Sequence, residues 1–185
     1  MAMDRVNKRR RHTGSAKFGA PWGRSVKLNT GLVMTILLVV LLVPLFVVPR
    51  KTDAMLALWL TPVAVVLVFG VTTLFAVCGF TVGNKELEVQ RLVWKTRLPL
   101  NGLKAVYADP EAMKGSLRKM GNGGYLAYSG WFWNRRLGGF RAFVTDSKRC
   151  VVLRFADRTL VVSPDDPEAF IEALGFDARA NGGAA

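Results

Sequence analysis

Two long uncharged runs, separated by only five residues, constrain this chain more than any other feature of its sequence. The first covers residues 31–48 and the second covers residues 54–80. A bilayer core about 30 Å thick takes roughly 20 helical residues to cross, and a backbone inside it must satisfy its own hydrogen bonds. We therefore predict two transmembrane helices, at about 29–48 and 54–80, that form an antiparallel hairpin.

Two other interpretations of these runs fit the sequence less well. A cleaved signal peptide would need a first region of about 30 residues and an apolar core beyond the usual 7–15 residues. No convincing small-x-small cleavage site follows Val48. Two helices buried in a soluble core would need a remaining domain that is large enough to cover them, and the rest of the chain is too short for that.

The distribution of positive charge predicts the orientation of the hairpin. Residues 1–30 carry eight Lys or Arg and one Asp, a net charge of +7, whereas the link between the runs carries only Arg50 and Lys51 as basic residues. Basic residues near transmembrane helices stay on the cytoplasmic side. Because an antiparallel hairpin returns to the side where it began, we expect both termini to be cytoplasmic.

The basic tail, residues 1–28, is expected to be disordered because it is rich in Gly, Ser, Asn and charged residues. Its densest cluster is Lys8, Arg9, Arg10 and Arg11. This cluster can hold the tail inside the cell, and it can also attract anionic lipid. Nucleic-acid binding is disfavoured, because only Phe18 and Trp22 interleave with the basic residues.

Residues 81–176 change to short strands separated by turns, followed by a helix. Alternating and β-branched stretches predict about seven strands, at 86–90, 93–98, 103–108, 125–129, 139–145, 150–155 and 159–163. Asp166 before Pro167 predicts a helix start, and Gly175 predicts its end. The expected fold is a mainly-β barrel or sandwich with one C-terminal α-helix, and residues 177–185 form a disordered tail.

The sequence GNGGYLAYSGWFWNRRLGGFRAFVTD, followed by VVLRF-ADRTLVVSPDDPEAFIEAL, resembles the bacterial pleckstrin-homology (PH) domains found behind paired transmembrane helices. The similarity covers about residues 80–175, and SPDDPEAF is its most specific part. It implies a PH-like fold in the bacterial cytoplasmic membrane. Folds of this kind bind phosphoinositides or peptides, so the resemblance implies a binding module but does not select the ligand.

The residues that catalysis would need are missing from the predicted domain. His12, the only histidine, lies in the basic tail, so Cys150 has no neighbouring base in the folded part. Asp165 and Asp166 are explained by the helix cap. The Gly-rich residues 121–124 lack the Lys-Ser/Thr of a phosphate loop, and the two cysteines lack metal-ligand spacing. We predict no enzyme, no catalytic residue, no cofactor and no metal.

One predicted hairpin combines aromatic and basic side chains and is the candidate contact site. Its residues are Trp131, Phe132, Trp133, Arg135 and Arg136. Such a turn favours contact with the bilayer interface or with a protein partner. In the alternative, Trp131 and Trp133 fill the domain core while Phe132 faces outward. The sequence leaves both interpretations open.

These observations lead to three functional hypotheses. The first is a membrane-anchored binding or scaffold module on the cytoplasmic face, which docks a protein partner or anionic lipid headgroups without catalysis. The second is an accessory subunit of a membrane complex for transport or envelope assembly. The third is an enzyme with an unrecognised site. The two apolar runs carry no charge, which argues against a transport path within this chain.

Overall fold

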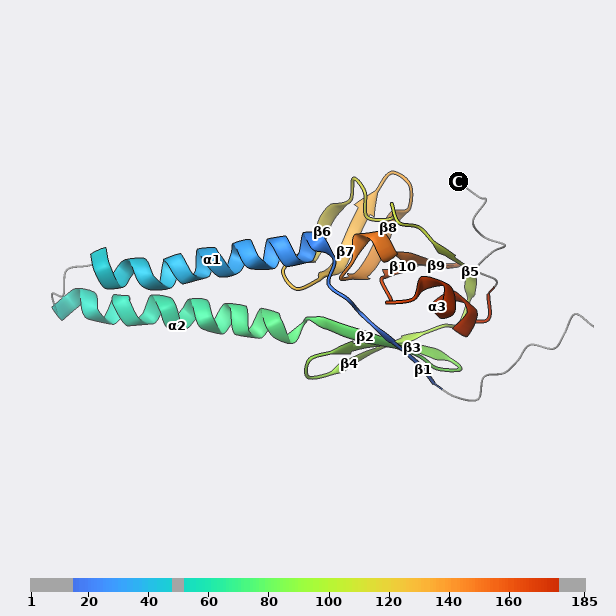
Figure 1. Ribbon diagram of the computed structural model, residues 1–185, viewed down its shortest axis with the longest axis horizontal. Coiled ribbons are helices and arrows are strands. Elements are labelled where there is room, and N and C mark those ends of the chain that lie inside the picture. The colour runs from blue at the N-terminus through green and yellow to red at the C-terminus, as the bar shows by residue number, and fades with distance from the viewer. Residues whose placement is uncertain (1–14, 48–51, 177–185) are drawn as a thin grey trace, which may run out of the picture.

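The computed structural model describes residues 15–47 and 52–176, with side chains for 15–42, 60 and 62–176. Two long helices are attached to a domain of two β-sheets (Figure 1). The helices are α1 (Arg24–Val47) and α2 (Thr52–Leu74). They lie side by side and extend away from the domain (Figure 1). A C-terminal helix, α3 (Pro167–Ala173), and a 3₁₀ helix, η1 (Ser147–Arg149), belong to the domain.

The helix pair forms where two membrane spans were predicted. Among the described residues, one stretch is long and apolar enough to cross a membrane, Arg24–Leu42 in α1. The corresponding apolar stretch in α2, Pro62–Leu74, is shorter. One candidate span is therefore present in the described part of the chain, and the paired arrangement in a membrane stays a prediction.

The second helix ends at Leu74, so the prediction that it continues to Phe80 is wrong. Residues Val77–Val82 instead form strand β2. Val77, Phe80 and Val82 are buried in the domain core. A fully buried strand is as continuously apolar as a membrane helix, so hydropathy alone does not separate them.

The end of the basic tail is ordered, which corrects the prediction of disorder for residues 15–28. Strand β1 (Ala16–Gly19) pairs antiparallel with β2, with Phe18 opposite Phe80, and α1 begins at Arg24. Phe18 packs edge-on against Phe170 at 5.1 Å between ring centroids. This burial of an aromatic ring stabilises a segment whose average composition is that of a disordered chain. Residues 1–14, with Lys8, Arg9, Arg10 and Arg11, lie outside the described residues.

The domain consists of two sheets, which confirms the prediction of a mainly-β fold with a C-terminal helix. The four-stranded sheet has the order β1-β2-β3-β4 and the six-stranded sheet has the order β5-β9-β10-β8-β7-β6. All pairs are antiparallel except β10 with β8. The remaining strands are β3 (Glu86–Arg91), β4 (Lys95–Pro99), β5 (Leu103–Ala108), β6 (Leu117–Gly123), β7 (Tyr128–Asn134), β8 (Gly138–Val144), β9 (Val151–Phe155) and β10 (Thr159–Val162).

Both faces of the six-stranded sheet bury apolar side chains. On β8, Phe143 points into the main core between the two sheets, which we call the inner face. Phe140, Ala142 and Val144 point to the other side, the outer face, where they pack with Phe132 in a second, smaller core. This alternation follows from the period of two along a strand.

The C-terminal helix begins as the sequence predicted and closes the main core. The Asp166 carboxylate accepts a hydrogen bond from the Ala169 amide at 3.0 Å, and Pro167 is the first helical residue. Gly175 ends the helix in the left-handed region, with φ of +81°. Phe170 is fully buried and lies edge-on to both Phe18 and Phe80.

Replacing Phe170 with Ala should lower the free energy of unfolding of the domain by about 3–5 kcal/mol, because it leaves a cavity between β1, β2 and α3. Urea denaturation of the full chain in detergent micelles, followed by near-UV circular dichroism, measures this loss. The control Leu117→Ala removes an exposed side chain and should change it by at most about 0.5 kcal/mol. Equal effects of the two substitutions would contradict the packing described here.

Candidate docking surface

The three aromatic residues of the predicted hairpin lie in strand β7 rather than in a turn. Phe132 is 3% exposed and stacks on Phe140, whereas Trp131 is 49% exposed and Trp133 is 38% exposed. The alternative in which the tryptophans fill the core is therefore wrong, and the two side chains point away from the core that holds Phe132. The pairing of β7 with β8 decides which of these side chains is buried. Phe132 lies directly opposite Phe140, so both side chains point to the same buried face of the sheet.

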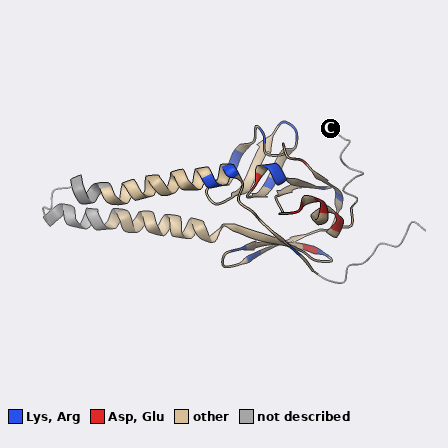
Figure 2. Ribbon diagram, viewed as in Figure 1, with Lys and Arg blue, Asp and Glu red and all other residues tan. Residues whose placement is uncertain are grey.

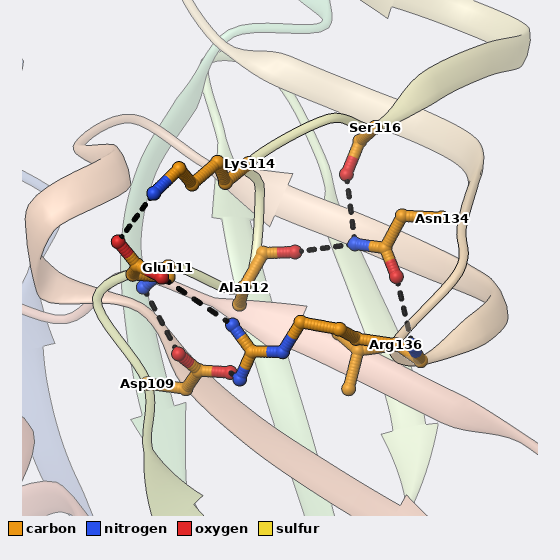
Figure 3. Close-up of polar contacts among 8 residues, drawn as sticks. Asp109, Glu111, Ala112, Lys114, Ser116, Asn134 and Arg136 are labelled. Carbon is orange, nitrogen blue, oxygen red and sulfur yellow. Dashed lines mark hydrogen bonds and ion pairs between the residues drawn. The ribbon is translucent and has the colours of Figure 1, made fainter. Parts of the chain in front are cut away.

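The two arginines that follow do not join the tryptophans. Arg136 donates from Nη2 to the Asp109 carboxylate at 2.8 Å, and Figure 3 shows it held between Asp109 and Glu111. Asp109 is only 7% exposed, so Arg136 neutralises a buried charge. Arg135, its neighbour in the turn, is exposed. Arg136 is thus a structural residue, and the predicted contact site is divided.

A polar network around Asn134 fixes the same region. The Asn134 side chain donates to the Ala112 carbonyl at 2.8 Å and to the Ser116 hydroxyl at 3.0 Å, and it accepts from the Leu137 amide (Figure 3). Asn134 is buried, so each of these bonds replaces one that water would otherwise make. The network ties the β7–β8 turn to the segment before β6.

Arg136→Ala should lower the free energy of unfolding by about 1–3 kcal/mol, because the buried Asp109 carboxylate loses its cation. The matched variant Arg135→Ala removes the same charge from an exposed neighbour and should be close to neutral. Urea denaturation of both variants in micelles measures the difference. A larger loss for Arg135→Ala would show that the turn is arranged differently.

Trp131 and Trp133 belong to an apolar part of the inner face that the four-stranded sheet leaves uncovered. Across the strands, Met120 lies opposite Trp131 and Leu117 lies opposite Trp133, and all four side chains are exposed. Within the six-stranded sheet, β5, β8, β9 and β10 contribute residues to the core between the sheets, but β6 and β7 contribute none. We call Leu117, Met120, Trp131 and Trp133 the open face.

The sequence pattern missed Leu117 and Met120, half of the open face, because it predicts no strand between residues 108 and 125, where β6 lies. It also missed Arg141, which lies directly opposite Trp131 on β8. Arg141 and Phe143 lie on one side of β8, as the period of two along a strand requires. Only the strand register, which the sequence does not give, brings Arg141 beside Trp131.

Arg91, on β3, connects the helix pair to both sheets. It donates from Nη1 to the Phe75 carbonyl at 2.6 Å, from Nε to the Thr96 hydroxyl at 3.1 Å, and from Nη2 to the Ser129 hydroxyl at 3.2 Å. These partners belong to the end of α2, to β4 and to β7. The rings of Phe75, Trp94 and Phe143 surround its guanidinium group at 5.4–5.9 Å.

The β3–β4 turn, residues 92–94, lies beside the end of α2 (Figure 1). Its tip is apolar and exposed, with Val93 at 68%, although the sequence predicted that Val93 begins a strand. Trp94 packs edge-on against Phe75 at 4.8 Å. This contact fixes the turn at the level where α2 meets the domain.

The loop of residues 124–127 makes hydrogen bonds to both α1 and α2. The Tyr125 hydroxyl shares a hydrogen bond with the Thr73 hydroxyl at 3.2 Å, and the Leu126 amide donates to the Thr30 hydroxyl at 3.0 Å. Tyr125 also lies edge-on to Phe69. The predicted strand 125–129 is therefore mostly a loop, and β7 begins at Tyr128.

A pocket of about 350 Å³ opens at this junction between helices and domain. It lies next to Arg91, because Ser129 both lines the pocket and accepts from Arg91. Basic residues lie at the domain end of α1, whereas acidic residues lie on and just before α3 (Figure 2). The pocket is lined by Thr72, Phe75, Arg118, Gly121, Asn122 and Ser129.

Residues 78–176, more than half of the chain, match the family model of the bacterial PH domain. The chain belongs to this family. The PH domain starts within β2 and ends just after α3, so β1 lies outside the matched region although it completes the sheet. The comparisons with curated proteins and with solved structures each give no match. PH domains are generally non-catalytic binding modules.

Cys150, the candidate nucleophile of the PH domain, is buried. Burial, together with nearby Asp109 and Asp146, raises the pKa of Cys150 to about 12, so this thiol is neutral at pH 7. Gly121 lies opposite Gly130 in the β6–β7 pair, where a side chain would strike the neighbouring backbone. In the described part of the chain, no group of three His, Cys, Asp or Glu is arranged to hold a metal.

In the folded protein, N-ethylmaleimide should modify exposed Cys78 and spare buried Cys150. Mass spectrometry of the labelled chain, native in micelles and unfolded in urea, distinguishes the two thiols. Because its pKa is raised from 9.0, neutral Cys150 stabilises the fold below about pH 9, and this contribution disappears as the pH rises towards 12. Equal labelling of both thiols under native conditions would contradict the burial of Cys150.

Proposed function

We propose that this PH domain is a membrane-anchored, non-catalytic docking module on the cytoplasmic face of a bacterial membrane. In this proposal α1 and α2 both span the bilayer, and the domain rests against the headgroup layer. The observation that carries the proposal is the exposed apolar turn of residues 92–94, fixed beside the end of α2 by Trp94 and Phe75. Tryptophan with aliphatic neighbours is the composition that membrane interfaces favour.

The firm attachment of the domain to the helices supports this placement. Tyr125 and Leu126 contact both helices. Arg91 donates a hydrogen bond to the carbonyl of Phe75, the residue that follows α2. A domain held at three points cannot tumble freely on a linker. If α2 crosses the membrane, the turn of residues 92–94 therefore reaches the interface without a change of conformation.

Basic side chains support attraction to anionic headgroups at the same level. Arg24 and Lys27 stand in the first turns of α1, close to the domain (Figure 2). Each basic residue near an anionic surface contributes about 1 kcal/mol of attraction. Lys8, Arg9, Arg10 and Arg11 would add to it and would favour cytoplasmic termini.

A protein partner is a second candidate for docking, favoured by the open face. Leu117, Met120, Trp131 and Trp133 form a continuous exposed apolar surface, which monomeric domains seldom leave uncovered. An accessory subunit of a transport or envelope-assembly complex would use such a surface. The open face and the turn of residues 92–94 lie on different sheets, so both contacts can coexist.

Site-directed spin labelling tests the membrane contact of the turn. The full chain, with Cys78→Ser and Cys150→Ala, carries a label at Val93→Cys and is reconstituted in phospholipid vesicles. The control label, Asn101→Cys, is at the exposed turn after the other end of β4. We expect collisions of the Val93 label with oxygen to exceed those with a water-soluble nickel chelate, and the reverse at Asn101. Equal access of the nickel chelate to both labels would refute the proposal.

A further inference from the structure

Basic side chains border the open face on two sides. Lys119 lies on β6 next to Met120 and is exposed, and Arg141 lies on β8 directly opposite Trp131. The ion pairs among the described side chains include neither Lys119 nor Arg141. An apolar surface between two such cations is complementary to a partner that has an apolar centre and acidic flanks.

The strands that carry the open face contain no acidic residue. Residues 112–145, which include β6, β7 and β8, contain six Lys or Arg and no Asp or Glu. Of these six, Lys114 and Arg136 form ion pairs with Glu111 and Asp109, which precede this stretch. A second copy of the chain would bring like charges together at this surface, which costs free energy. The charge therefore favours an acidic partner over self-association.

A bilayer is a less suitable cover for the whole open face than a protein. Strand β6 ends and β7 begins at the loop of residues 124–127, which bonds both helices, so Leu117 and Trp133 lie at the end of these strands that is farther from that loop. In the described part of the chain β6 pairs with β7 alone. The backbone groups on its other edge cannot enter an apolar layer without a large cost.

The shape of β6 favours a helix, rather than another strand, as the element that covers the open face. The pairing of β6 with β7 shifts its register between Arg118 and Met120, and Gly121 has a φ of +109°. A register shift and a left-handed residue interrupt the regular edge that an added strand needs. A helix packs on the face of a sheet and does not need a regular edge.

We propose that the open face docks an amphipathic helix of a partner protein, one that has an apolar stripe and acidic flanks. The stripe, with apolar residues at i, i+3, i+4 and i+7, covers the four side chains of the open face. The acidic flanks lie beside Lys119 on one side and beside Arg141 on the other. This inference rests on the proposed docking role of the domain and names the kind of partner. It does not need residues 92–94 to touch the membrane.

The test uses the full chain in phosphatidylcholine nanodiscs and a synthetic helical peptide of Ala, Leu and Glu, about 15 residues long. Its leucines form one stripe, and its glutamates lie on either side of that stripe. A second peptide has Lys in place of Glu, and a third has the same composition as the first with its leucines spread around the helix. Fluorescence anisotropy of the labelled peptides measures affinity, and empty nanodiscs give the background.

Two matched pairs of variants locate the binding site. Met120→Ser and Val93→Ser each shorten an exposed apolar side chain, 71% and 68% exposed, and only the first lies in the open face. Lys119→Glu and Lys104→Glu each reverse the charge of an exposed lysine on an edge strand of the six-stranded sheet, β6 and β5 respectively. Circular dichroism checks that each variant folds.

We expect saturable binding of the acidic helix, with affinity about tenfold weaker in Met120→Ser than in Val93→Ser. Binding should also be weaker in Lys119→Glu than in Lys104→Glu, and this difference should shrink at high salt because the charges are screened. The Lys peptide and the peptide with scattered leucines should each bind about tenfold or more weakly than the acidic helix.

Equal affinity for the three peptides, or equal affinity within each pair of variants, would overturn the proposal. Absence of saturable binding of the acidic helix below about 1 mM would also overturn it. A spin label at Met120→Cys, in the chain with Cys78→Ser and Cys150→Ala, tests the bilayer as the cover. Collisions with oxygen that exceed those with the nickel chelate at this position would assign the open face to lipid and refute a helix. The Val93 label reports on the membrane contact separately, so either proposal can fail without the other.

Discussion

The partly buried guanidinium group of Arg91 joins the helix pair to both sheets of the domain. Arg91 receives no carboxylate, yet its three nitrogen atoms bond the end of α2, strand β4 and strand β7. Helix pair, four-stranded sheet and six-stranded sheet thus meet at one side chain. The orientation of the domain relative to the helices depends on this junction, and so does the position of the β3–β4 turn. Lysine could not replace it, because a compact ammonium group lacks donors that point in three fixed directions.

The six-stranded sheet explains why the domain has an exposed apolar surface at all. It is wider than the sheet that packs on it, so β6 and β7 continue past the main core. Their outer side is still covered, by the segment that includes Ala112 and is fixed through Asn134 and Asp109. Their inner side has no such cover. A PH domain built in this way exposes an apolar surface without losing any of its own core.

The sequence predicted features that depend on local chemistry and missed those that depend on strand partners. The helix at Asp166 and Pro167 followed from capping rules, and the alternation of Phe140, Ala142 and Val144 followed from strand period. The end of α2 was misplaced, because a buried strand such as β2 has the hydropathy of a membrane helix. The sequence left the exposure of Trp131 open and missed the structural role of Arg136. Each is decided by a contact with another segment, namely the pairing of Phe132 with Phe140 on β8 and the ion pair of Arg136 with Asp109.

Strand β1 has a consequence for how the domain can be assembled. It precedes the two helices, and its partner β2 follows them, so the whole helix pair is a long insertion within one β-hairpin. Closing a loop of that length costs chain entropy, which the pairing of Phe18 with Phe80 and the packing of Phe18 on Phe170 must offset. A fragment that begins at the start of the family match lacks β1 and leaves β2 as an unprotected edge. The helix pair and the domain are therefore joined twice, once through the chain that leads into β2 and once through the strand that precedes α1.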